Sequence, residues 1–106
     1  MKRNIDAKFR KAVLEAVWDI PYGRVMGYKD VACKVGYPNY ARHVGFVLSA
    51  TFEDELPWWR VVRSNGSIAL KGDPVRGPIQ VQKLKEERVP FCNERVDIAK
   101  VRYLEE

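Results

Sequence analysis

The stretch YKDVACKVGYPNYARHVGFVLSA, residues 28–50, decides the expected fold. Its apolar spacing predicts a short helix over residues 28–35, and Gly36 can end that helix in a left-handed conformation. Asn39 is a candidate cap for a second helix that runs to about Ala50. Two short helices joined by a glycine-containing turn form a helix-turn-helix.

The second of these helices combines an inward face with basic residues at its start. The expected inward residues are Ala41, Val44, Gly45 and Leu48. Gly45 costs about 1 kcal/mol in a helix interior, so its presence predicts that another backbone approaches closely there. Arg42 and His43 lie at the end that such motifs usually present to nucleic acid.

The flanking segments complete one domain. Apolar residues from Phe9 to Ile20 recur at helical spacing, with Asp6 as a cap and Pro21 as the stop. Downstream we expect two extended pieces, at residues 61–62 and 68–70, joined by a turn at 64–67. A glycine- and proline-rich loop at 71–78 and a helix at 79–88 should follow. The tail from Arg95 to Leu104 has no clear pattern. We therefore expect a single mixed α/β, mostly helical domain over residues 1–106.

Composition narrows the class of partner. The chain has 106 residues, a net charge of +5 and a pI near 9.4, which favours a polyanionic partner. No apolar run approaches the roughly 20 residues of a membrane span, and the basic start has no apolar segment behind it, so we expect a cytoplasmic protein. We expect Cys33 and Cys92 to be buried or half-buried. Two cysteines and one histidine are too few ligands for a zinc site, so no metal or cofactor is predicted.

Sequence patterns offer little support for catalysis. The one histidine, His43, fits a surface position better than a catalytic one, and the acidic run of residues 53–55 is typical of a solvated face. The unusual feature is PWWRVV, residues 57–62. Neighbouring side chains of extended backbone point in opposite directions, so one tryptophan can lie in the core while the other lines a cavity. An aromatic wall suits a flipped purine, although one core residue and one lid residue would explain the pair equally well.

Four motifs in order resemble the C-terminal, DNA-binding domain of the O6-alkylguanine-DNA alkyltransferases, from Phe9 to about Phe91. IPYGRV at 20–25 is similar to the family's I-P-x-G-x-V segment, and Tyr28 stands at its helix-opening tyrosine. YARHVG at 40–45 resembles the A-R-x-V-G motif. PWWRVV resembles the active-site P-C-H-R-V-V.

The departure from that last motif is decisive. The transferases use its cysteine as the nucleophile and the adjacent histidine to activate it, whereas this chain has Trp58 and Trp59. An indole has neither a thiol nor a proton-accepting nitrogen, so alkyl transfer to this position is excluded. The sequence thus resembles the alkyltransferase-like proteins, a non-enzymatic subgroup. Members with tryptophan at the first position usually keep the histidine, so Trp59 is a second departure.

The resemblance implies roles for individual residues. Arg42 is the finger that fills the gap left by the flipped base, and Tyr28 pushes on the phosphate of the target nucleotide. The expected DNA-binding set is Tyr28, Tyr40, Ala41, Arg42, His43 and Gly45. The expected lesion pocket is formed by Trp58, Trp59, Val61, Ser64 and Lys71, although Trp59 could face the core instead. Arg60 is expected to be buried or bound to a partner.

The resemblance also implies a function. The chain would bind O6-alkylguanine in double-stranded DNA through the minor groove, flip the nucleotide without alkyl transfer, and signal to nucleotide excision repair through a UvrA-type damage sensor, as a monomer without zinc. Three alternatives remain: a transferase that uses Cys33 or Cys92, a helix-turn-helix regulator of undamaged DNA, and an interaction module that does not bind DNA.

Overall fold

The computed structural model describes residues 7–51, 53, 55–69 and 73–104. The first helix, α1 (Ala7–Trp18), forms as its spacing predicts, with one apolar face in the core. The helix ends before Pro21, and the predicted cap Asp6 lies outside the described residues. None of the helices in the described ranges is long and apolar enough to cross a membrane.

The predicted helix-turn-helix is present as α2 (Tyr28–Lys34) and α3 (Ala41–Ser49). Gly36 has φ 92°, and the following N–H of Tyr37 donates to Ala32 O at 2.9 Å, which ends α2 in a left-handed turn. The predicted cap Asn39 is wrong, because Tyr40 stands at that position and makes no side-chain cap. The turn continues one residue further than the sequence suggested, since Tyr40 N–H donates to Tyr37 O.

Two short strands join the halves of the molecule. β1 (Met26–Gly27) pairs in parallel with β2 (Val61–Val62), with Met26 opposite Val61. The segment before β2 is a 3-10 turn, η1 (Trp58–Arg60), where extended backbone was expected. The predicted turn after β2 forms around Gly66 (φ 88°), but Ile68 and Ala69 form no strand, and Leu70 lies outside the described residues.

The C-terminal part contains most of what the sequence did not predict. Helix α4 spans Arg76–Glu86 and begins three residues earlier than expected. Asp73 caps the helix by accepting hydrogen bonds from the N–H groups of Val75 and Arg76. Pro78 lies in the first turn of α4, where proline is tolerated. The unassigned tail forms a hairpin of β3 (Phe91–Cys92) and β4 (Arg95–Val96), followed by α5 (Ile98–Val101).

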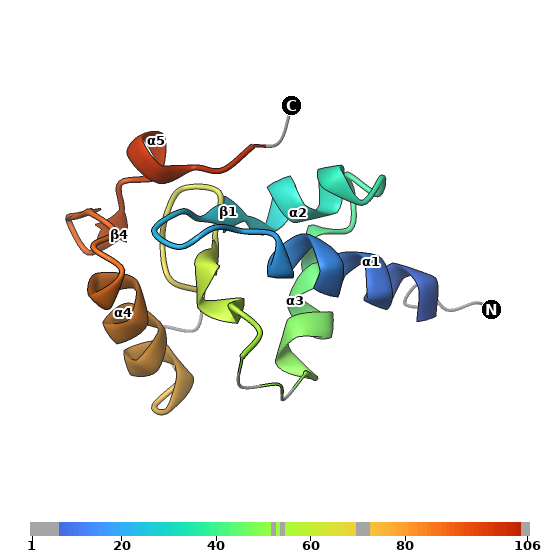
Figure 1. Cartoon of the computed structure of the whole chain (residues 1–106), viewed down its shortest axis with the longest axis horizontal. Helices are drawn as coiled ribbons and strands as arrows, with labels where there is room; N and C mark the ends of the chain where they lie inside the picture. The colour runs from blue at the N-terminus through green and yellow to red at the C-terminus, as the bar shows by residue number, and fades with distance from the viewer. Residues whose placement is uncertain (1–6, 52, 54, 70–72, 105–106) are drawn as a thin grey trace.

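The core consists of two clusters, one on each side of β1 and β2. One cluster is built by α1, α2 and α3, and the other by α4, the hairpin and α5. Figure 1 shows these two groups of elements at opposite ends of the molecule.

Cys33 and Cys92 are free and exposed, so their predicted burial is wrong. Short elements bury only one face, and in α2 that face is taken by Val31 and Ala32.

Candidate nucleic-acid interface

The helix-turn-helix brings four of the six predicted DNA-binding residues, among them Tyr28 and Arg42, to one hollow. Tyr28 is the first residue of α2, and Arg42 is the exposed second residue of α3. Both line a hollow of about 430 Å³. The other lining residues are Ala41, Gly45, Phe46, Arg63 and Ala69.

A smaller hollow adjoins the first and reaches Trp58. Its lining residues are Tyr28, Gly45, Leu48, Ser49, Trp58 and Arg76. Tyr28 and Gly45 line both hollows, which are therefore adjacent. We call the hollow that includes Arg42 the outer hollow and the hollow that includes Trp58 the inner hollow. The inner hollow has a volume of only about 20 Å³, which is room for about one water molecule. A base can enter it only if surrounding side chains move.

Gly45 keeps both hollows open. The predicted close approach of another backbone is wrong: a methyl group at Gly45 would meet only the Tyr28 ring, at 3.8 Å from its Cε1 atom. The missing side chain therefore leaves space between α3 and the tyrosine, which is a use of glycine that the helix periodicity does not reveal.

The electrostatics of the two hollows are positive. Arg42, Arg63 and Arg76 line them, and their described lining residues include no Asp or Glu. Burial raises the pKa of Tyr28, and the nearby Arg63 and Arg76 oppose that rise without cancelling it. The phenol is therefore protonated at neutral pH and can donate a hydrogen bond to an anionic oxygen.

The 3-10 turn sends the two tryptophans in different directions. Trp58 is half-buried and lines the inner hollow, whereas Trp59 is 9% exposed and belongs to the C-terminal core cluster. Their rings meet edge to face, with centroids 6.0 Å apart. Trp59 and the fully buried Val61 therefore contribute no lining to either hollow, in contrast to the predicted pocket.

Sequence comparisons with known proteins identify relatives of the chain. Residues 8–89 match the family described as the DNA-binding domain of 6-O-methylguanine DNA methyltransferase. A Vibrio parahaemolyticus protein named DNA base-flipping protein is 41% identical over 77% of this chain and 81% of its own length. The Schizosaccharomyces pombe alkyltransferase-like protein 1 is 39% identical over 77% of each chain.

The chain belongs to the alkyltransferase-like family.

A solved structure supports the same assignment. The crystal structure of Schizosaccharomyces pombe Atl1 in complex with damaged DNA containing O6-carboxymethylguanine superposes with a TM-score of 0.87 at 29% identity, over 95% of this chain and 99% of that one. The predicted fold, an alkyltransferase-type DNA-binding domain with a helix-turn-helix, is confirmed.

In this alkyltransferase-like protein, Trp59 takes part in a buried polar network. Its indole Nε1 donates to Glu87 Oε2 at 2.8 Å, and the same carboxylate accepts from Arg60 Nη2 at 2.7 Å and from the Gly23 N–H at 2.9 Å. Arg60 also donates to Ile20 O. The expectation of a bound Arg60 is confirmed, while Glu87 had no signal in the sequence beyond being one more carboxylate on a charged helix end.

The remaining predicted residues that the structure describes do not line the two hollows. Tyr40 and His43 stack with ring centroids 4.5 Å apart, beside the start of α3. Ser64 is exposed in the turn after β2, and Lys71 lies outside the described residues. Sequence reasoning missed Phe46, Arg63 and Arg76, whose roles emerge only when separate segments come together. Their DNA contacts, like those of the motif residues, stay predictions.

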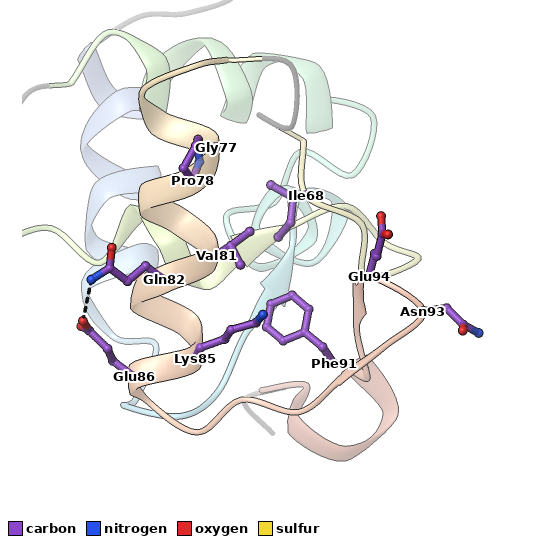
Figure 2. A pocket seen from close by; sticks show the side chains of 10 residues that line it. All are labelled: Ile68, Gly77, Pro78, Val81, Gln82, Lys85, Glu86, Phe91, Asn93 and Glu94. Carbon is purple, nitrogen blue, oxygen red and sulfur yellow. Dashed lines mark hydrogen bonds between the residues drawn. The ribbon is translucent and has the colours of Figure 1, made fainter.

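A larger hollow lies elsewhere and contains none of the predicted residues. It has a volume of about 930 Å³ and lies between α4 and the β3–β4 hairpin. Figure 2 shows the side chains of Val81 and Ile68 close to each other, with the Lys85 side chain beside the Phe91 ring. Its lining residues are mixed in charge, so size alone does not make it the nucleic-acid site. Among the described residues, no group of three His, Cys, Asp or Glu side chains gathers to hold a metal ion.

Proposed function

We propose that this chain binds O6-alkylguanine in double-stranded DNA, turns the damaged nucleotide out of the helix and holds it without transferring the alkyl group. The observation that carries the proposal is the convergence of Tyr28, Arg42, Gly45 and Trp58 on two adjoining hollows. These residues come from three separate motifs. The complex of the Schizosaccharomyces pombe relative with damaged DNA supports the same function.

Arg42 is the group that replaces the flipped base. Its side chain is exposed at the start of α3 and lines the mouth of the outer hollow. A guanidinium is flat, so it can stack between base pairs while it donates hydrogen bonds to the orphaned base. Flipping costs a few kcal/mol, and the cost is smallest for a poorly paired base, which favours a damaged guanine over a normal one.

Tyr28 and Arg63 act on the DNA backbone. Tyr28 keeps its proton because burial raises the pKa of its hydroxyl, so it can donate to the phosphate of the target nucleotide as it rotates. Arg63 is exposed at the rim of the same hollow and adds charge-assisted contacts. Contacts to phosphates carry no sequence information, which suits a protein that docks in the minor groove and searches for damage.

The chain retains the lesion because none of the described residues that line the inner hollow is a cysteine. Trp58 occupies the place of the reactive cysteine, and an indole is not a nucleophile for alkyl transfer. The two cysteines are exposed on α2 and β3, and neither lines the outer or the inner hollow. If one of them reacted, intact-mass measurement after incubation with O6-methylguanine DNA would show one added methyl group.

The retained lesion must be removed by another activity. We extend the proposal to nucleotide excision repair, with a UvrA-type damage sensor as the partner and this chain as a monomer on the DNA. Stimulated binding of purified UvrA to a lesion duplex in the presence of this chain would support that extension. Equal UvrA binding with and without the chain would contradict it.

The test is equilibrium binding to one duplex with and without a single O6-methylguanine, at fixed salt. We expect the wild type to prefer the damaged duplex and Arg42→Ala to lose most of that preference. Arg95→Ala is the matched control. Arg95 is exposed in the hairpin, so this substitution removes the same charge at a place away from both hollows. Equal binding to both duplexes by the wild type would refute damage recognition.

A further inference from the structure

We infer that Arg76 makes this chain selective for O6-alkylguanines whose alkyl group carries a negative charge. The inference rests on the proposed function and concerns the choice among lesions. It assigns to Arg76 a role that neither the sequence motifs nor the site residues expected from them include.

Arg76 lies against the aromatic wall of the inner hollow. The carbon of its guanidinium is 5.5 Å from the centroid of the Trp58 ring, and its Nη2 donates to the backbone oxygen of Thr51 at 3.4 Å. The side chain is half-buried and lines the inner hollow together with Leu48 and Ser49. A base that stacks on Trp58 therefore meets this guanidinium.

The start of α4 fixes the backbone of Arg76. Asp73 Oδ1 accepts the N–H groups of Val75 at 2.8 Å and of Arg76 at 2.9 Å. These two hydrogen bonds hold the pKa of Asp73 below its usual value, so the cap is charged at neutral pH. The backbone at Arg76 is therefore anchored beside the inner hollow.

Arg76 is placed differently from the other two arginines. Arg42 and Arg63 line the outer hollow, where the proposal places the DNA backbone and the vacated stack. Of these three arginines, Arg76 is the one that lines the inner hollow. Phosphate binding therefore does not explain its position beside Trp58.

The chemistry of the guanidinium selects the ligand class. Five N–H donors in one plane can keep a contact with the protein and still form a paired, charge-assisted contact with a carboxylate. A neutral alkyl group of the same size offers no such partner. An O6-carboxymethyl group would place a carboxylate within reach of the base edge, so lesions of this class should bind more tightly.

The test compares duplexes that contain O6-carboxymethylguanine or O6-carbamoylmethylguanine. The two substituents are alike in size and differ in charge. We expect the wild type to bind the carboxymethyl duplex about tenfold more tightly, as for one added charge-assisted hydrogen bond. In Arg76→Gln the two affinities should become equal, because the charge that distinguishes the two substituents no longer meets a guanidinium.

Arg63→Gln is the matched control, because it removes the same charge from the outer hollow. It should weaken binding to both duplexes alike and preserve their ratio. A wild-type ratio near one, or a ratio that Arg76→Gln leaves unchanged, would overturn the role of Arg76. Equal binding of the wild type to duplexes with O6-methylguanine and with guanine would instead refute the proposed function, so the two failures are distinguishable.

Discussion

Replacing Glu87 by glutamine should destabilise the fold severely while preserving side-chain size. The Glu87 carboxylate is 8% exposed and accepts hydrogen bonds from Trp59, Gly23 and Arg60. Removing one partner of a buried ion pair costs about 3–5 kcal/mol. Because the Arg60 side chain is 14% exposed and keeps its bond to Ile20 O, we expect a loss of about 3 kcal/mol in the free energy of unfolding.

The loss should depend on pH. Burial alone would raise the pKa of Glu87, but the hydrogen bonds from Arg60, Gly23 and Trp59 outweigh it and hold the pKa below its usual value. The carboxylate therefore stabilises the fold fully above the pKa of the unfolded state, about 4.3. That contribution disappears as the pH falls through the lower pKa of the folded state, so the difference between wild type and Glu87→Gln should shrink in acid.

Urea unfolding at pH 7 and at several acidic pH values measures this difference. Glu86→Gln is the matched control, because Glu86 is the exposed neighbour, and it should change the free energy of unfolding by less than about 0.5 kcal/mol. Trp59→Phe removes one donor and part of a buried ring, so it should cost more than about 1 kcal/mol. A Glu87→Gln protein as stable as the control at pH 7, or an equal loss at every pH, would refute this account of the network.

Three further predictions concern other parts of the chain. Gly45→Leu should fill both hollows and abolish the preference for damaged DNA in an anisotropy titration, while binding to undamaged duplex persists; retained preference would show that the base binds elsewhere. Gly66→Ala should cost more than about 2 kcal/mol in urea unfolding, because a methyl group there would collide with Val96 O at a positive φ; near-wild-type stability would contradict the turn geometry. Burial opposes but does not cancel the effect of the Arg102 and Gly27 hydrogen bonds, which lower the pKa of Asp30, so Asp30→Asn should destabilise the fold at pH 7 and progressively less as the pH falls below the unfolded-state pKa of about 3.9 in thermal unfolding. A pH-independent loss would exclude the Asp30 charge as the cause.

The parts of the fold that the sequence predicted are those governed by local periodicity. The apolar spacing of α1 and the glycine-containing turn between α2 and α3 depend on residues close together in the chain. The buried Gln80 depends on distant partners, since its side chain donates to Trp59 O and Val61 O. Such a contact has no periodic signature. The start of α4 was placed in a loop for a local reason, because Gly77 and Pro78 are typical of loops.

The candidate site divides in the same way. Motif similarity singled out Tyr28, Arg42 and Trp58, which the structure brings to adjoining hollows. It did not reveal that a 3-10 turn would direct Trp59 into the core, because adjacent residues in extended backbone and in a turn point differently. Arg76 escaped notice because its proximity to Trp58 depends on the packing of α4.

The position of the damaged base in a complex tests the central claim most directly. We would determine the structure of the chain bound to a duplex with one O6-methylguanine. The account predicts that this base lies outside the helix, against Trp58 between Tyr28 and Gly45, with the Arg42 side chain in the vacated stack. A base that remains stacked and paired, with Arg42 on a phosphate, would contradict it.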